Sequence, residues 1–97
     1  MGYYTKFDIS ENPLTVQQEI EDISEYSDWY EGQLHAKWYE YEKHCRKVSE
    51  DFPNLVIVVE GHGEEPGDDW KAYFKQGKMQ KAKAVVTYAE FDESKLK

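Results

Sequence analysis

Apolar and charged residues alternate at the start of the chain. One side of an extended segment over residues 3–9 would carry Tyr3, Thr5, Phe7 and Ile9. Lys6 and Asp8 would lie on the other side. A period of two is typical of a strand with one buried face, and Pro13 follows as a break. The pattern therefore predicts a half-buried strand over residues 3–9.

A helical period replaces this alternation after Pro13. Apolar or small residues recur at Val16, Ile20, Ile23 and Ser27. Thr15 and Gln18 stand three residues apart, which is the spacing of a capping box, in which two side chains satisfy free backbone N–H groups. The pattern predicts a helix over residues 15–27.

The middle of the chain predicts a short strand, a second helix and a buried strand. Residues 33–38 fit a short strand after the break at Gly32. A helical stripe then runs through Trp38, Tyr41, Cys45, Val48 and Phe52. Pro53 ends this helix. Residues 55–59 form a continuous, largely β-branched run, which predicts a strand buried on both faces.

The last third predicts a loop and a hairpin. Residues 61–69 are polar and contain glycine, as in a loop, and residues 70–75 and 79–91 are strand-like segments around a turn at Gln76-Gly77. The order of elements favours an α+β fold, a ferredoxin-like sandwich with a mostly antiparallel sheet and two helices on one face. The expected core contains Ile20, Ile23, Cys45, Val48, Val56, Ile57 and Val58.

Length and charge narrow the class of protein. The 97 residues are enough for a single domain over the whole chain, and the net charge is −8. Residues 1–34 hold eight acids and one lysine, whereas residues 71–84 hold five lysines and no acid. An acidic field disfavours direct contact with nucleic acid or membranes and favours basic protein surfaces. The lone Cys45 fits a reducing compartment, so we expect a cytoplasmic protein without an internal disulfide.

The densest polar cluster lies at residues 60–69, with His62 and five carboxylates. A divalent metal or acid–base catalysis would suit those groups, but the spacing matches no calcium loop and no phosphate loop. We therefore expect a solvated connection or a partner contact, with no cofactor, no metal and no enzymatic activity. Cys45 falls on the apolar stripe of the second predicted helix, as a small core residue would. His44 falls off that stripe, on the solvent side.

Lysines and aromatic residues interleave in the predicted hairpin. Trp70, Tyr73 and Phe74 accompany the five lysines of residues 71–84. Such a face can stack single-stranded bases. The alternative is that the lysines protect an edge strand or pair with the acidic loop, which suits the acidity of the rest of the chain better.

The first predicted helix presents a row of carboxylates. Glu21, Glu25 and Asp28 would lie at i, i+4 and i+7, with Glu19 and Asp22 beside them. Like charges four residues apart destabilise a helix by a few tenths of a kcal/mol per pair, and the segment contains no lysine to offset this. The row either mimics the backbone charge of a nucleic acid toward a basic partner or is an ordinary solvated face of an acidic protein.

Several residues resemble a family of small phage and prophage proteins. The relevant segments are Lys37-Trp38-Tyr39, Phe52-Pro53, the run from Val59 to Asp68, and the hairpin at Gly77. Their order is similar to the ferredoxin-like domain of YubB-type plasmid and phage proteins, over roughly residues 35–80. The resemblance implies that fold and a mobile-element origin, and it brings no catalytic motif.

Small size, concentrated negative charge and this resemblance together lead to one functional expectation. We expect a phage-encoded inhibitor of a host nucleic-acid-handling defence system, of the anti-CRISPR or anti-restriction type, acting in the host cytoplasm as a monomer or homodimer. It would occlude a basic groove of a host nuclease or effector complex. The expected contacts are Glu21, Asp22, Glu25, Asp28, Tyr26, Trp29, Tyr30, Glu64, Glu65, Asp68 and Asp69. The alternatives are a small-molecule or nucleotide binder that uses the aromatic hairpin, and an assembly factor that dimerises through a sheet edge.

Overall fold

The computed structural model describes residues 3–83 and residue 94. The two helices are α1 (Leu14–Ser24) and α2 (Tyr41–Asp51). The strands are β1 (Thr5–Asp8), β2 (Gln33–Ala36), β3 (Ile57–Gly63), β4 (Asp69–Lys75) and β5 (Lys78–Lys83). The predicted strand over residues 79–91 is confirmed as far as Lys83, and its remainder lies outside the described residues.

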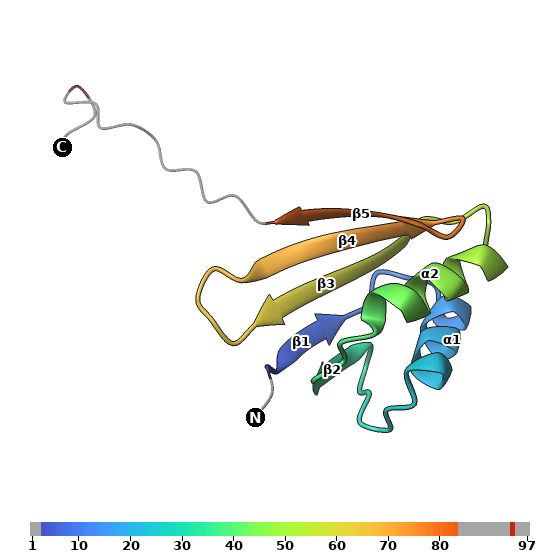
Figure 1. Cartoon of the computed structure of the whole chain (residues 1–97), viewed down its shortest axis with the longest axis horizontal. Helices are drawn as coiled ribbons and strands as arrows, with labels where there is room; N and C mark the ends of the chain where they lie inside the picture. The colour runs from blue at the N-terminus through green and yellow to red at the C-terminus, as the bar shows by residue number, and fades with distance from the viewer. Residues whose placement is uncertain (1–2, 84–93, 95–97) are drawn as a thin grey trace.

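The strands form one antiparallel sheet in the order β2-β1-β3-β4-β5. Both helices lie on the same face of this sheet (Figure 1). The predicted α+β class, the antiparallel sheet and the two helices on one face are therefore confirmed. The element order β-α-β-α-β-β-β and the strand order differ from the β-α-β-β-α-β pattern of the ferredoxin-like fold.

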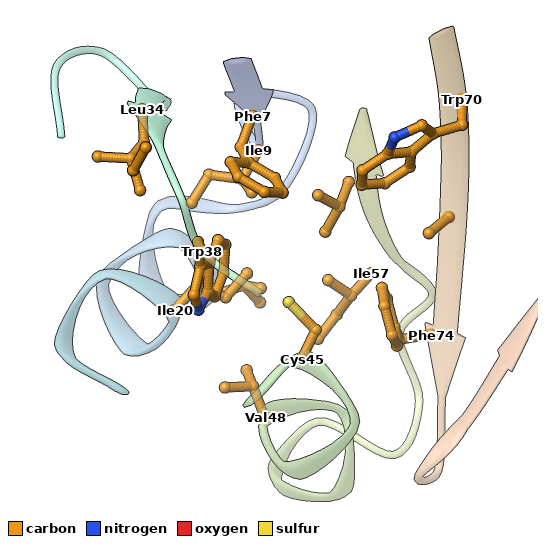
Figure 2. Close-up of a cluster of buried hydrophobic side chains, with 14 residues drawn as sticks. Phe7, Ile9, Ile20, Leu34, Trp38, Cys45, Val48, Ile57, Trp70 and Phe74 are labelled. Atoms are coloured by element: carbon orange, nitrogen blue, oxygen red, sulfur yellow. The ribbon is translucent and has the colours of Figure 1, made fainter. Parts of the chain in front are cut away.

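The core lies between the helices and one face of the sheet. Alternate residues of the strands point into it, while α1 and α2 contribute their apolar stripes, so Trp70 and Phe74 of β4 share the interior with Cys45 and Val48 of α2 (Figure 2). The alternation predicted for residues 3–9 is confirmed, because Thr5, Phe7 and Ile9 are buried. Four of the expected core residues, Ile20, Cys45, Val48 and Ile57, are buried, and Ile23 packs partly against them.

The opposite face of the sheet carries no helix, and this corrects the prediction for residues 55–59. Val58 is only half-buried, and Val56 is 52% exposed before the strand begins. The β-branched run looked doubly buried because a sequence does not show whether a second layer covers the sheet. The side chain of Asn12 ties this strand to the β1–α1 connection, since its amide donates to the Val58 carbonyl at 2.7 Å and accepts from the Val58 N–H at 2.9 Å.

Strand β3 is longer than predicted, because it includes residues 60–63, which were expected to begin a loop. Gly61 is a strand residue covered by the ring of Trp70. A Cβ atom at position 61 would lie 2.1 Å from two atoms of that ring, so the glycine makes room for the indole. The glycine therefore marks a close packing contact within the sheet rather than a turn.

Helix α1 begins and ends differently from the prediction. Its N-cap residue is Pro13, no side chain caps the helix, and Thr15 is exposed, so the predicted capping box is wrong. The buried Gln17 side chain instead donates to the Asn12 carbonyl at 2.7 Å. The helix ends at Ser24, because Glu25 adopts a left-handed conformation with φ 63°. Residues 25–27 therefore lie outside the helix that was predicted to include them.

The predicted turn between the last two strands is confirmed. Gln76 and Gly77 have φ of 51° and 78°, and two consecutive positive values are typical of a type I′ hairpin turn. The turn is fastened to α2, where the Ser49 hydroxyl accepts the Gly77 N–H at 2.9 Å and Arg46 donates to the Gly77 carbonyl at 3.0 Å. The hairpin is thereby held against the helical layer.

Burial predicts how Ile57, the first residue of β3, and Val56, the residue before it, respond to truncation. Ile57→Ala should lower the free energy of unfolding by about 2–5 kcal/mol, because it leaves a cavity in the core. Val56→Ala should lower it by less than about 1 kcal/mol, since Val56 is half in solvent. Urea denaturation followed by circular dichroism measures both values. Equal losses for the two variants would contradict the one-sided sheet.

Candidate interaction surface

The carboxylates predicted for one helix face divide between α1 and the connection that follows it. Glu21 is half-buried and Asp22 is exposed on α1, whereas Glu25 and Asp28 are exposed beyond the end of the helix. The predicted i, i+4, i+7 row is therefore wrong. The left-handed backbone at Glu25 turns the chain away before the row can continue.

These acids still form a continuous stretch without a basic residue. Residues 19–31, hereafter the acidic segment, contain Glu19, Glu21, Asp22, Glu25, Asp28 and Glu31. Within residues 3–83, none of the six forms an ion pair with a lysine, arginine or histidine. Asp22 accepts one hydrogen bond, from Gln18 at 3.0 Å. The acidic segment thus presents negative charge that the described part of the chain does not neutralise.

The three aromatic residues expected as anchors occupy different environments. Tyr26 and Trp29 are half-buried and pack against the core. The Trp29 N–H donates to the Ser24 hydroxyl at 2.9 Å, and its ring meets Trp38 edge to face at 5.6 Å. Tyr30, in contrast, is 74% exposed. Trp29 therefore holds the connection in place, and Tyr30 is the aromatic residue that this surface offers to a partner.

The other group of predicted contacts lies elsewhere. Glu64, Glu65 and Asp68 belong to the β3–β4 loop, and Asp69 is the first residue of β4. This loop and α1 lie at opposite ends of the molecule (Figure 1). The structure therefore does not bring the two groups of acids into one surface.

The acids near the loop are engaged with neighbouring groups. Glu64 accepts the Tyr4 N–H at 2.9 Å, and Asp68 accepts the Tyr3 hydroxyl at 2.6 Å. The hydrogen bond to Asp68 raises the pKa of Tyr3 above its usual value. Asp69 lies 2.7 Å from His62 across the open sheet face. These contacts fasten the start of the chain to the β3–β4 loop.

The hairpin lysines lie on both faces of the sheet. Lys71 lies 3.3 Å from Glu60 and 3.6 Å from Glu11, and the hydrogen bond to Glu60, together with the nearby charge of Glu11, raises the Lys71 pKa. Lys71 therefore pairs with acids across the sheet. Lys81 points to the other face, 4.6 Å from the centre of the Trp70 ring.

Cys45 and His44 have structural surroundings. Burial raises the pKa of Cys45 to about 12, so its sulfur is a thiol at neutral pH and a poor nucleophile. His44 was expected in solvent, but it is half-buried. Its Nδ1 accepts the Trp38 N–H at 2.9 Å, while its Nε2 faces Glu40 at 3.3 Å. The need to satisfy a buried indole explains why a histidine off the apolar stripe points inward.

Within the described residues, no group of three or more His, Cys, Asp or Glu side chains is placed to hold a metal ion. In that same part of the chain, neither helix is long and apolar enough to span a bilayer.

The chain matches no protein-family model, no curated protein and no solved structure in the comparisons made. The resemblance to YubB-type proteins thus remains an expectation from the quoted residues. The geometry of the site carries the functional argument.

Sequence reasoning missed a hollow on the helix side of the sheet. Tyr39, Tyr41 and Thr5 line it together with Trp70. The aromatic residues at positions 38, 39 and 41 were a signal, but Trp38 and Tyr41 were assigned to the stripe of the second helix and Tyr39 was given no role. Their convergence with β1 and β4 depends on the sheet order, which the sequence does not reveal.

A carboxyl pair joins the two helices and predicts a pH effect. Partial burial, and then a hydrogen bond with Asp51, raise the pKa of Glu19 above its ordinary 4.5. A raised folded-state pKa means that protonation stabilises the fold, and that this stabilisation is lost as the pH rises from 4.5 through the folded value. Asp8 acts oppositely. Burial alone would raise the Asp8 pKa, but hydrogen bonds from Ser10 and Gln33 outweigh burial and hold it below 3.8. The ionised carboxylate therefore stabilises the fold above pH 3.8, and this stabilisation is lost as the pH falls through the folded value.

Asp51→Asn should therefore flatten the fall in stability above pH 4.5, because the amide can donate to an ionised Glu19. Urea midpoints measured in half-unit steps from pH 4 to 7 test this. Asp28→Asn is the matched control, since Asp28 is an exposed acid of the acidic segment, which also contains Glu19. An unchanged slope in Asp51→Asn would show that the two carboxyls are not coupled.

Proposed function

We propose that this protein is a non-enzymatic binding protein whose acidic segment, with Tyr30 at its end, docks on a basic protein surface. The observation that carries the proposal is the unneutralised charge of the segment. It has six acids and no base, and none of the six is ion-paired within the described residues. Asp22, Glu25, Asp28 and Glu31 are exposed, so these four acids are accessible to a partner.

The distribution of charge over the fold supports this orientation. Strands β4 and β5 hold the five lysines at positions 71–83, while residues 19–31 follow the helical side. Charge is therefore unevenly distributed between the acidic segment and the last two strands. A polarised molecule is oriented as it approaches a charged partner, and this steering raises the association rate in a salt-dependent way.

A basic groove that normally holds nucleic acid is the class of partner that this surface fits best. Carboxylates on a short helix and an adjoining connection can replace a run of phosphates, and Tyr30 can supply an apolar contact. We propose the groove of a host defence nuclease or effector complex. The phage setting rests on the resemblance alone, whereas the basic partner rests on the charge.

The test compares two charge reversals that change net charge equally. Asp22→Lys with Asp28→Lys alters the acidic segment, and Glu64→Lys with Glu65→Lys alters the β3–β4 loop at the other end. Glu25 is left intact because its backbone is left-handed. Tagged proteins are used to capture partners from host lysate, and the affinity of the captured partner is then measured by calorimetry at several salt concentrations.

The first pair should weaken binding by about 2–5 kcal/mol, because closely matched charges are replaced by like ones. The loop pair should have a much smaller effect, which reflects long-range attraction only. Binding should also weaken as salt rises. Equal losses for the two pairs would contradict the acidic segment as the contact. Capture of an acidic partner, or binding indifferent to salt, would contradict the proposal as a whole.

A further inference from the structure

A cavity of about 220 Å³ lies on the helix side of the sheet, beside the start of α2. The sheet, α2 and the β2–α2 connection all contribute side chains to its lining. Its lining residues are Tyr3, Thr5, Phe7, Trp38, Tyr39, Tyr41, Asp68, Trp70 and Lys81. The volume is below the usual 300–1,000 Å³ of sites for drug-sized ligands, so it suits a single ring system.

Two polar groups at this cavity have no partner. Thr5 is 9% exposed and Trp70 is 7% exposed, and within residues 3–83 neither the Thr5 hydroxyl nor the Trp70 indole N–H forms a hydrogen bond. No side-chain polar atom of the described residues is both fully buried and unsatisfied. The two atoms must therefore keep contact with open space, and the cavity is the space that both residues line. Both atoms are therefore accessible to a ligand that enters the cavity, and such a ligand would have to replace the water that they contact.

Two charged groups complete the lining. The Tyr3 hydroxyl accepts the Glu65 N–H at 3.1 Å and donates to Asp68 Oδ2 at 2.6 Å, which fixes the carboxylate in place. That carboxylate retains acceptor capacity for a further donor. Lys81 Nζ lies 4.6 Å from the Trp70 ring centre and 5.8 Å from that of Tyr41. The cavity thus combines an acceptor, a donor N–H, a hydroxyl and a cation with aromatic walls.

We propose that this cavity binds a planar heteroaromatic ring of the nucleobase class, as part of a mononucleotide. Such a ring packs against aromatic side chains and carries both donors and acceptors on its edge. A donor of the ring would bond to Asp68, and an acceptor would receive the Trp70 N–H or the Thr5 hydroxyl. A purely apolar ring would leave these buried groups unsatisfied and would bind poorly.

The phosphate of the nucleotide has a place beside the ring. A second, shallower hollow shares Tyr3 and Asp68 with the cavity and extends along the β3–β4 loop to Lys83. Lys81 and Lys83 follow the same face of β5, because they pair with Ala72 and Trp70. A ring in the cavity therefore places an attached phosphate near two ammonium groups. This site lies apart from the acidic segment, so a test of nucleotide binding is independent of whether the proposed protein partner exists.

The test follows the indole N–H signals of the three tryptophans by NMR at about 0.15 M salt, where long-range repulsion from the acidic surface is screened. The probes are AMP, ribose 5-phosphate and benzoate. AMP should shift the Trp70 signal saturably in the millimolar range or below. Ribose 5-phosphate lacks the ring, and benzoate lacks the donor, so each should bind at least about tenfold more weakly.

Matched variants separate the ring contact from the phosphate contact. Thr5→Val removes the hydroxyl at nearly constant volume and should weaken AMP binding roughly three- to tenfold, while Thr5→Ser should retain it. Lys83→Gln should weaken AMP by roughly threefold and leave adenosine unchanged, because Lys83 lines only the second hollow. Lys78→Gln is the control. It changes the charge by the same amount on the same strand, but Lys78 lies on the opposite face of the sheet.

Three results would overturn the site. Ribose 5-phosphate binding as tightly as AMP would reduce it to a phosphate contact on lysines. Benzoate binding as tightly as AMP would show an unselective aromatic surface. No saturable shift of Trp70 with AMP would exclude a mononucleotide, and native spectra of the variants would show that the failure is not one of folding.

Discussion

One constraint governs this fold, namely that two short helices must cover one face of a sheet larger than themselves. Each helix has 11 residues, or about 16 Å, whereas β3 has 7 residues, or about 23 Å. The uncovered end of the inner face must be filled by large side chains. Trp38, Tyr41 and Trp70 fill it, with Tyr41 stacked on Trp70 at 4.8 Å and Phe7 edge-on to Trp38 at 5.1 Å. Large rigid rings leave hollows at their margins, and the cavity beside Thr5 is such a hollow.

The sequence predicted those features that local chemistry determines. The alternation of β1 and the positive φ values of the 76–77 turn follow from neighbouring residues, and both are confirmed. The extent of β3 does not follow from neighbouring residues, because Gly61 looks like a loop residue until Trp70 is placed above it. The predicted end of α1 was wrong for a similar reason. Helical spacing continues to Ser27, but the packing of Trp29 on Trp38 and its bond to Ser24 draw the chain out of the helix.

The candidate surfaces show the same division. The composition of the acidic segment was visible in the sequence, since a run of acids without bases needs no fold to be recognised. Its separation from the β3–β4 loop was not visible, because the distance between two acidic runs depends on the strand order. The aromatic cavity was the least predictable feature. Its lining comes from four separate stretches of the chain, and the unpartnered groups of Thr5 and Trp70 are recognisable only once burial is known.

The contrast between the two ends of the molecule bears on what each can do. At the acidic segment four of the six carboxylates are exposed to water, so their contribution to binding is sensitive to salt and is large only where a partner's charges match them closely. At the cavity the polar groups are few and belong to largely buried residues, so each one contributes more to binding and requires a ligand group that matches it. The first arrangement gives rate and orientation, and the second gives selectivity. The two surfaces share no residue, because the acidic segment covers residues 19–31 and every residue that lines the cavity lies outside that range. The fold can therefore hold both surfaces without either being built at the expense of the other.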